Sequence, residues 1–562
     1  MLSPSPSLVE EIQRTCGVSR TTARVLANRG ISCGEKARAF LRADLNDLED
    51  PFTLTDMDVA SHRLVEAVRQ GEKVFIYGDY DADGVTSTAL LYTALAQLGG
   101  RPFCYIPERI AEGYGLNSEA LARIAQSGAR LVVALDCGIR SCEEVEFARS
   151  LGMEVIILDH HLPGPTLPAA TAVVCPKREE PGHPLGDLAS VGLAFKLGEA
   201  LCSNMGGDIS DFRASFLDLA ALGTLADIVP LCGENRTLAK RGLEALGRTR
   251  KPGLIALIQA AGPKTISERE VVFGLVPRLN AAGRVRHARL AVNLLLARDQ
   301  DAANRLAAEL ERANSERQKE QRKVQREAAW LMETEYGGKG RQPQVIVIWG
   351  EGWHEGVLGI VASRLTNETG CPTIVLTVKE DEAKGSARSI PGFNVTEALE
   401  RCSHLLLRCG GHSQAAGLSL LKDNLPAFRD LINEVAREMM ETTALPESIQ
   451  IDASLPLAEA DLRLLGEVEG LAPFGAGNAA PVFMAEGVVP WDIRRVGADK
   501  SHLTFKVVSP EDKTVRRCVA FGAGSLELKE GRPVSVCFHL LADDFGNGLH
   551  PQLEVVDIKV SP

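Results

Sequence analysis

The chain has 562 residues, of which 45% are hydrophobic and 24% are charged, and a formal net charge of −12. This composition is typical of folded globular protein, and the length exceeds what one hydrophobic core supports, so we expect several domains. The acidic balance argues against a protein that coats nucleic acid uniformly. No apolar stretch approaches the about 18 residues that cross a bilayer, and the first residues lack a signal-peptide run, which predicts a cytoplasmic protein without membrane contact.

The predicted elements begin, in chain order, with short helices over residues 1–70. Short apolar strands then alternate with helices, which is typical of a parallel α/β sheet. The strands are predicted at 72–78, 130–136 and 154–161, and the helices at 86–99, 118–128 and 142–152. A further buried helix is predicted over 215–231, ending near Asp227.

The second half of the chain begins with a segment that lacks Gly and Pro, which predicts a long connector helix over 286–336. Residues 278–329 hold twelve basic and seven acidic side chains, a local charge of +5. A second α/β block follows, and from about 448 short β-like runs predict a small barrel of the OB-fold type. The expected domains are 1–70, 71–285, 286–336 as the connector, 337–447 and 448–562.

Acidic side chains follow the predicted strands at the point where each strand ends. They are Asp79, Asp81 and Asp83 after the first strand, Asp136 after the second, Asp159 with His160 and His161 after the third, and Asp227 after the later helix. The carboxyl ends of parallel strands share one sheet edge, where ligands bind. Converging carboxylates repel unless cations neutralise them, so the first strand is expected to hold its acids rigidly for metal.

Oxygen ligands with one or two imidazoles suit Mn²⁺ or Mg²⁺, and the number of acids indicates two ions sharing one carboxylate. Two such ions activate water and stabilise the leaving oxygen in phosphoryl hydrolysis. A calcium loop is excluded because its twelfth position is Leu90 and a strand precedes it. A dinucleotide site is disfavoured because no G-x-G-x-x-G follows these strands. The 13 cysteines form no C-x-x-C pair, which is typical of reduced thiols.

Several motifs resemble those of the DHH phosphoesterase superfamily and, within it, the RecJ exonucleases. The four acidic motifs are "GDYDADG", "LDCG", "LDHH" and "LGTLADIVPL". Further segments are similar to the RecJ branch in wording and order, among them "PERIAEGYGLN", "VPRLNAAGR", "WHEGVLGIVASRL", "GSARSIPGFN", "GGHSQAAG" and "APFGAGNAAPVF". Together they cover most of the chain from about residue 20 onward. The resemblance implies a DHH catalytic domain, a DHH-associated substrate-binding domain beyond the connector helix, and an OB-fold DNA-binding domain.

The resemblance also implies roles for the acidic residues. Asp81 and Asp136 would hold one ion, and Asp83, Asp136, His160 and Asp227 the other, with Asp136 bridging. Asp159 would orient its neighbours, and His161 would contact the scissile phosphate. The pyrophosphatase branch has a histidine where this chain has Tyr77, and the RecJ branch supplies Asp79 instead, so Asp79 is assigned to the first ion.

For the substrate, the resemblance implies a pocket for a 5′-terminal phosphate. It consists of Arg109, Ser386 and Arg388, with Arg278 near its entrance. Guanidinium groups suit phosphate because they donate in a bidentate fork. The remaining expected substrate-binding residues are Tyr114, Asn280, His354, Gly410, Gly411 and His412. Packing is an equal explanation for Tyr114 and His354, and a plain turn is an alternative for the two glycines.

The implied activity is 5′–3′ exonucleolytic hydrolysis of single-stranded DNA to 5′-mononucleotides in DNA repair and recombination. Two alternatives stay open: a DHH phosphodiesterase for short oligonucleotides or cyclic dinucleotides, and an inactive replication scaffold. The connector and barrel favour long DNA, and every expected metal ligand is present. A single-strand-binding protein and a RecQ-type helicase are partners that the family implies, and we expect a monomer.

Overall fold

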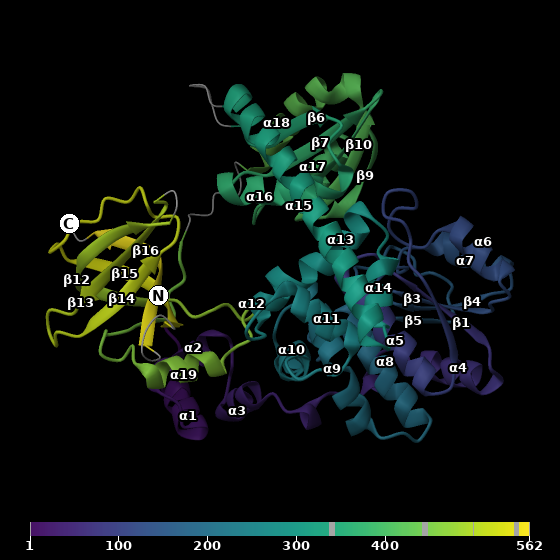
Figure 1. Cartoon of the computed structure of the whole chain (residues 1–562), viewed down its shortest axis with the longest axis horizontal. Helices are drawn as coiled ribbons and strands as arrows, with labels where there is room; N and C mark the ends of the chain where they lie inside the picture. The colour runs from purple at the N-terminus through teal and green to yellow at the C-terminus, as the bar shows by residue number, and fades with distance from the viewer. Residues whose placement is uncertain (1, 337–342, 441–447, 498–499, 544–549, 561–562) are drawn as a thin grey trace.

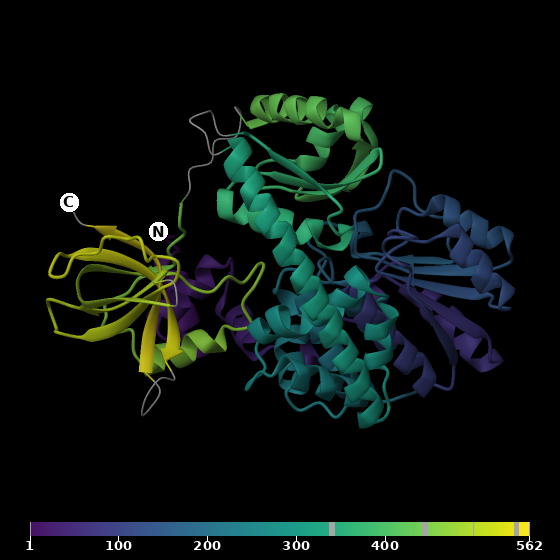
Figure 2. The same cartoon turned by 45° about the horizontal axis from the view of Figure 1, so that its top comes forward.

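The computed structural model describes residues 2–336, 343–440, 448–497, 500–543 and 550–560. Three sheets organise these residues, and Figure 1 shows them as three bodies. The first α/β domain contains sheet strands β1–β5, the second α/β domain contains β6–β10, and the barrel contains β11–β16. The turned view in Figure 2 shows the long helix α15 running from the first α/β domain into the second. The class predicted from sequence, two α/β domains joined by a long helix plus an OB-like barrel, is confirmed.

The first sheet is parallel, in the order β2-β1-β3-β4-β5. Its strands are β1 (Lys73–Gly78), β2 (Arg101–Tyr105), β3 (Leu131–Leu135), β4 (Glu154–Leu158) and β5 (Ala172–Val174). Helices cover both faces, as continuous apolar strands require. One face packs on α4 (Met57–Gln70), α5 (Ala82–Gln97), α8 (Ser190–Asn204) and α9 (Ile209–Ala226). The other packs on α6 (Ser118–Gln126) and α7 (Cys142–Ser150).

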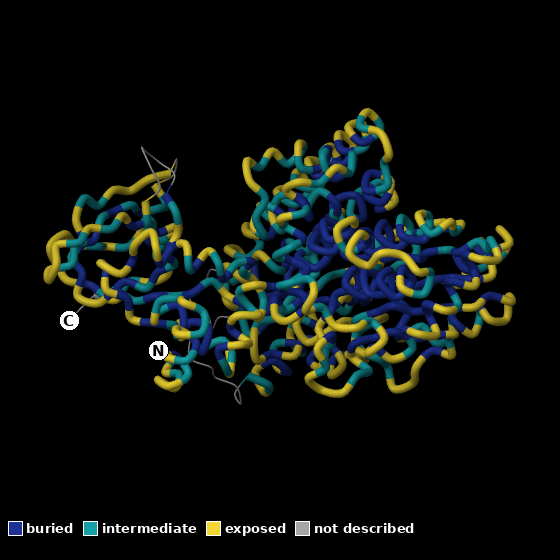
Figure 3. Tube along the Cα trace, turned by 90° about the horizontal axis from the view of Figure 1, so that it is seen from below, coloured by how far each residue is buried: buried dark blue, intermediate teal, exposed yellow. Residues whose placement is uncertain are grey.

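A group of helices extends the core of the first α/β domain toward α15. They are α10 (Gly233–Leu246), α11 (Pro252–Ala261), α12 (Glu268–Glu270), α13 (Val276–Val285) and α14 (Arg289–Leu295). The tube in Figure 3 shows the extensive buried interior of this domain in dark blue. No helix among the described residues is long and apolar enough to span a membrane.

The connector helix α15 spans Gln300–Tyr336, so it begins later than the expected residue 286. The reason is local: the Asp299 carboxylate accepts a hydrogen bond from the Ala302 N–H at 2.8 Å, which starts a new helix after α14 ends. The four domain boundaries expected from sequence stay predictions, and those near 337 and 447 fall on residues outside the described ones.

The second α/β domain has a mixed sheet in the order β6-β7-β8-β10-β9. Its strands are β6 (Ile346–Glu351), β7 (Thr373–Lys379), β8 (Glu382–Arg388), β9 (Leu406–His412) and β10 (Ala415–Leu421). One face packs on α15 and α16 (Glu355–Thr369), and the other on α17 (Val395–Arg401) and α18 (Leu425–Met440). The exposed edge strand β9 carries Gly410, Gly411 and His412.

The barrel closes because β12 pairs with both β13 and β15. Its strands are β11 (Ala453–Ser454), β12 (Phe483–Val496), β13 (His502–Val508), β14 (Val515–Ala520), β15 (Val534–Asp543) and β16 (His550–Val560). Its core continues into α19 (Leu462–Gly470) and into the first three helices of the chain. These are α1 (Pro6–Cys16), α2 (Arg20–Asn28) and α3 (Gly34–Arg42), which lie beside α19 in Figure 1.

Polar contacts from α10 join this barrel unit to the first α/β domain. The cations are Arg236, Lys240 and Arg241, and their acceptors are backbone carbonyls at the C-terminal ends of α3 and α19. Arg236 is 1% exposed and also lies over the Phe40 ring, with 3.7 Å to the centroid. The C-terminal end of a helix is negative, so cations are favourable there. These contacts therefore join the barrel unit to the first α/β domain.

Candidate active site

The predicted acidic residues converge at one edge of the first sheet. The possible ligand atoms of Asp79, Asp81 and Asp136 lie within 4.8 Å of one another, and so do those of Asp83, His160 and Asp227. Asp136, His160 and His161 form a third group by the same measure. These groups fall into the two ligand sets expected from the motifs, with Asp136 in the first set and close to His160 of the second.

The acids of the first motif are placed by a helix start as well as by a strand. Strand β1 ends at Gly78, so Asp79 follows it directly. Asp81 instead caps α5, with its Oδ1 accepting from the N–H groups of Asp83 and Gly84 at 3.0 Å each. The expectation that the first strand holds these acids is therefore met by Asp79 only, since the start of α5 positions Asp81 and Asp83. Asp81 takes the capping position because the first N–H groups of a helix have no acceptor within the helix, and its carboxylate supplies one.

Burial and mutual repulsion perturb these carboxyl groups. Burial, followed by the charge of Asp81, raises the pKa of Asp83 to about 7. Burial and then the charges of Asp83 and Asp81 raise the pKa of Asp227 to about 9. The same causes, with burial first, raise the pKa values of Asp79 and Asp136 well above their usual range. This edge of the first sheet therefore carries more carboxyl groups than the nearby cations can neutralise.

The donor set fits a divalent cation. Asp79 Oδ1 and His160 Nε2 are buried and have no hydrogen-bond partner among the described residues. Burial, then the neighbouring charge of His161, lowers the pKa of His160 to about 4, which keeps its imidazole neutral and able to bind metal. Buried carboxylates with a neutral imidazole are the ligands that Mn²⁺ and Mg²⁺ accept.

A second set of contacts orients His161. Its Nδ1 lies 2.6 Å from Asp159 Oδ1, and Asp159 Oδ2 accepts from the Ile139 N–H at 3.0 Å. Burial alone would lower the pKa of His161, but the hydrogen bond and charge of Asp159 outweigh it and raise that pKa. The Tyr114 hydroxyl lies 3.1 Å from the same nitrogen and donates to the Asp136 carbonyl at 2.9 Å. The structure thus brings Tyr114, which the motifs left open, to the acidic edge.

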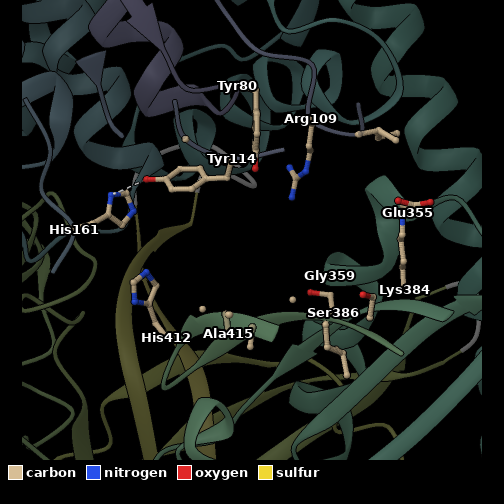
Figure 4. Close-up of a pocket in the computed structure, with 18 of the residues that line it drawn as sticks. Tyr80, Arg109, Tyr114, His161, Glu355, Gly359, Lys384, Ser386, His412 and Ala415 are labelled. Carbon is tan, nitrogen blue, oxygen red and sulfur yellow. Dashed lines mark hydrogen bonds between the residues drawn. The ribbon is translucent and has the colours of Figure 1, made fainter. Parts of the chain in front are cut away.

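Beside the acidic edge lies a cavity of about 980 Å³ between the two α/β domains, which Asp159 and His161 line on that side but none of the six expected metal ligands does. The rings of His161 and His412 face each other across it, with centroids 5.8 Å apart. Figure 4 shows one rim formed by Tyr80, Arg109, Tyr114 and His161, and the opposite rim formed by Glu355, Gly359, Lys384, Ser386, His412 and Ala415. Of the expected substrate-binding residues, the cavity is lined by Arg109, Tyr114, Ser386, Arg388, Gly410, Gly411 and His412.

Four arginines line this cavity: Arg140, and a group formed by Arg109, Arg284 and Arg388, none of which has a carboxylate partner within ion-pair distance among the described residues. Burial, followed by the charges of Arg109, Arg317 and Arg388, lowers the pKa of Arg284 to about 9. Burial and then Arg109 lower the pKa of Arg388. A half-buried cluster of like charges is stabilised by an anion, and phosphate matches guanidinium geometry.

Close packing shapes the pocket around Arg388. Its Nη1 donates to Ser386 Oγ at 2.9 Å. A Cβ atom on Gly359 of α16 would lie 2.8 Å from Arg388 Nη2, so a glycine there leaves room for the guanidinium. Arg284 was missed by sequence reasoning, although it ends the quoted motif "VPRLNAAGR". Its convergence with Arg109 depends on packing between distant elements.

Three expected substrate-binding residues do not line the cavity. Arg278 pairs with Glu311 at 2.6 Å and donates to the Gly274 carbonyl at 2.7 Å, so its charge is used within the fold. His354 caps α16, accepting from the Gly356 N–H at 3.1 Å. Asn280 has a buried Oδ1 without a partner among the described residues.

The barrel carries exposed aromatic side chains of the kind that stack on bases. Trp491 is 42% exposed, with Lys506 Nζ at 4.7 Å from its ring centroid, and Phe521 is 61% exposed. Phe505 is 2% exposed and belongs to the core, because side chains alternate in direction along β13.

Comparison with known proteins identifies the parts of the chain. Family models match residues 73–224 (DHH family, N-terminal domain), 342–438 (DHHA1 domain) and 451–557 (RecJ OB domain). The single-stranded-DNA-specific exonuclease RecJ of Bacillus subtilis is 39% identical, over 99% of this chain and 70% of the relative. The protein of the same name from Escherichia coli is 36% identical, over 82% of each chain.

Solved structures agree. The crystal structure of RecJ from Thermus thermophilus in complex with Mn²⁺ superposes with a TM-score of 0.84 at 31% identity, covering 100% of this chain and 79% of that chain. Its Mg²⁺ complex superposes with a TM-score of 0.79. The whole-chain identity, the three family domains and the acidic edge agree with one another, and the chain belongs to the RecJ family of single-stranded-DNA-specific exonucleases.

Proposed function

We propose that this chain hydrolyses single-stranded DNA from its 5′ end and releases 5′-mononucleotides. The observation that carries the proposal is the arrangement of the cavity. A cluster of buried acids that fits two divalent ions lies beside a cavity that Asp159 and His161 line on that side, and a cluster of arginines without carboxylate partners lines the same cavity. The first cluster suits the scissile phosphate and the second suits a terminal phosphate, as an exonuclease needs.

The acids would hold two Mn²⁺ or Mg²⁺ ions. One ion would lie among Asp79, Asp81 and Asp136, and the other among Asp83, His160 and Asp227. Asp136, which also groups with His160, is proposed as the ligand that both ions share. When bound, such ions supply an activated water and charge stabilisation at the phosphate. The ions also supply the positive charge that this edge lacks, which allows all these carboxyl groups to ionise.

His161 is proposed to contact the scissile phosphate. Asp159 holds its Nδ1 and favours the protonated imidazole, so Nε2 carries a proton that it can donate to a phosphate oxygen. His412 faces it across the cavity, and burial lowers the pKa of His412, so the two rings are not both expected to carry charge. Tyr114 fixes the position of His161 and the Asp136 backbone together.

End recognition is assigned to Arg109, Arg284, Arg388 and Ser386. A terminal phosphate monoester carries more charge than an internal diester, so three guanidiniums favour it over the middle of a strand. Gly410 and Gly411 lie on the edge strand β9 and line the cavity, and their lack of side chains lets the backbone approach the nucleotide. The barrel is proposed to hold the strand beyond the cavity through Trp491, Phe521 and nearby cations.

The direct test compares single strands labelled at the 5′ end with the same strands labelled at the 3′ end, in the presence of Mn²⁺. A 5′–3′ enzyme releases labelled mononucleotide at once from the first and progressively shorter fragments from the second. Labelled mononucleotide released first from the 3′ end would contradict the polarity, and cleavage of a circular single strand would contradict the need for an end.

The alternatives have less support. A phosphodiesterase for short oligonucleotides or cyclic dinucleotides needs only the two α/β domains, whereas this chain also matches the RecJ OB domain over 451–557. A scaffold without activity would not need to retain every expected metal ligand at one edge.

We also propose that the chain works as a cytoplasmic monomer with a single-strand-binding protein and a RecQ-type helicase as partners. These proposals rest on the family resemblance. Light scattering on the purified chain tests the monomer, and binding of each purified partner without DNA tests the two contacts.

A further inference from the structure

Helix α8 begins at the acidic edge, and its first residue touches two of the carboxylates. The side chain of Ser190 is fully buried. Its Oγ donates to Asp136 Oδ1 at 2.9 Å, and its backbone N–H donates to Asp83 Oδ2 at 2.8 Å. The next N–H, that of Val191, donates to Asp83 Oδ1 at 2.9 Å. One residue therefore connects two acids that come from different elements.

Both acids need such support. Asp136 has φ 63°, in the left-handed region that costs energy for a residue with a side chain, so the surrounding contacts must hold it there. Asp83 lies in the first turn of α5, on a separate element. Without a cation, two ionised carboxylates held by the same residue repel each other. A neutral hydroxyl and two N–H groups attract both without adding a competing charge.

We propose that Ser190 is a positioning residue that fixes Asp136 relative to Asp83 and so sets the affinity of the metal site. The inference rests on the proposed two-ion site, and no role for Ser190 follows from the motifs. A hydroxyl occupies one lone pair of Asp136 Oδ1 and leaves the other oxygen, Oδ2, free of this contact. Hydrogen-bonding partners of this kind orient the ligands, and losing one typically costs about 10–100-fold in metal affinity.

A plain structural role is the rival explanation, since any buried hydroxyl needs a partner. Ser87 of α5 offers the matched control. It is also fully buried, and its Oγ donates to the backbone carbonyl of Asp83 at 2.7 Å, without touching a carboxylate. Ser87→Ala therefore removes a buried hydroxyl from the same neighbourhood and spares the ligand oxygens.

The experiment measures Mn²⁺ binding to the full chain by calorimetry, with the melting temperature of the metal-free protein alongside. Ser190→Ala keeps both N–H contacts to Asp83 and is expected to weaken Mn²⁺ binding by about 10–100-fold. Ser87→Ala is expected to bind Mn²⁺ like the unmodified chain, and Ser190→Thr, which keeps the hydroxyl, to bind more tightly than Ser190→Ala. Turnover of the Ser190→Ala variant should recover as Mn²⁺ is raised, which a misfolded site would not allow.

Unchanged Mn²⁺ affinity in folded Ser190→Ala would overturn the inference, as would an equal loss of affinity in Ser87→Ala. Should Ser190→Ala fail to fold, the Ser190→Thr variant decides: Mn²⁺ binding as weak as in a chain lacking Asp136 would refute a role for the hydroxyl. The proposed function fails separately, if the unmodified chain binds Mn²⁺ tightly and leaves single-stranded DNA intact.

Discussion

Two clusters of like charge lie at the same cavity, the arginines in its lining and the acids beside it, and they are built differently. The acidic cluster comes from strand ends and helix starts of one domain, with Asp79, Asp83 and Asp136 each at most 3% exposed. The arginine cluster comes from three elements of both domains: the loop after β2, helix α13 and strand β8. Short side chains on rigid backbone hold the acids, whereas long side chains reach into the cavity from a distance.

This difference separates chemistry from recognition. Each acid has little freedom to move, so removing one leaves a gap that no neighbour fills. Each arginine shares its role with two others on flexible stems, so removing one weakens the pocket by degrees. Mutations in the acidic cluster should therefore act nearly all-or-none, and mutations in the arginine cluster should be graded.

The largest effect is expected at the shared ligand. Asp136→Ala should reduce hydrolysis by at least about 10²–10³-fold, because losing an electrostatic contact to the reacting group already costs that much elsewhere and here both ions lose a ligand. Circular dichroism should show an intact fold. Turnover like that of the unmodified chain in a folded variant would remove the two-ion proposal.

Replacing Arg109 or Arg388 with Ala should have a smaller effect. Use of short 5′-phosphorylated strands should weaken by about 1–3 kcal/mol, the value of a charge-assisted contact. The same strands with a 5′-hydroxyl should lose much less, and Mn²⁺ affinity should stay unchanged. An equal loss of Mn²⁺ affinity would show that these residues belong to the metal site rather than to end recognition.

The pH dependence of stability should separate the metal-free from the metal-loaded protein. In the metal-free protein the folded pKa values of Asp83 and Asp227 are raised to about 7 and about 9. Because these two carboxyl groups bind protons more tightly in the folded state, they contribute stability that is fully present below their unfolded pKa of about 4. This stability is lost as the pH rises through 7 and then 9. Mn²⁺ binds the ionised forms, so the rise in melting temperature that it causes should be larger at pH 8 than at pH 5.5.

The control for this prediction is Asp227→Asn, which should flatten the metal-free pH profile above pH 7. A Mn²⁺-induced rise that is equal at both pH values would mean that protons and metal do not compete at this edge.

The smallest effect on cleavage is expected from removing the barrel, provided that its partner helices are removed too. A chain of residues 45–447 should still degrade short oligonucleotides, bind 30-nucleotide strands more weakly, and show a shallower salt dependence of binding, because phosphate contacts are lost. Removing 448–562 alone would leave the apolar faces of α1–α3 uncovered, and aggregation of that version is the expected contrast. Equal affinity and salt slope in the folded double truncation would mean that the barrel does not bind DNA.

The acidic cluster was predictable from sequence because its position depends on where each strand ends, which the nearby sequence indicates. Strand ends meet at one edge in any parallel sheet, so Asp136 and Asp159 could be placed together without knowing the rest of the fold. The long helix and the barrel were equally visible in composition and spacing. The start of α15 was not, because it depends on one capping contact at Asp299.

The arginine cluster and its surroundings were less predictable. Arg284 and Ser190 act through contacts with elements far away in sequence, and neither has a local pattern that distinguishes it from a surface arginine or a buried serine. The opposite holds for Arg278 and His354, for which the sequence pattern predicts more than their contacts show. They stand in family motifs, yet their side chains make local contacts to Glu311 and to the start of α16.

The packing of α1–α3 on the barrel also bears on how the chain folds as it is made. The Ser19 N–H bonds to Glu467, 448 residues later, and Asn28 bonds to Asp452. At about 5–20 residues per second, translation takes roughly 20–90 s to supply those partners. The catalytic domains can fold in that interval, while α1–α3 stay uncovered. Nascent chains should therefore expose these helices to chaperones or proteases until residues 452–467 have been synthesised.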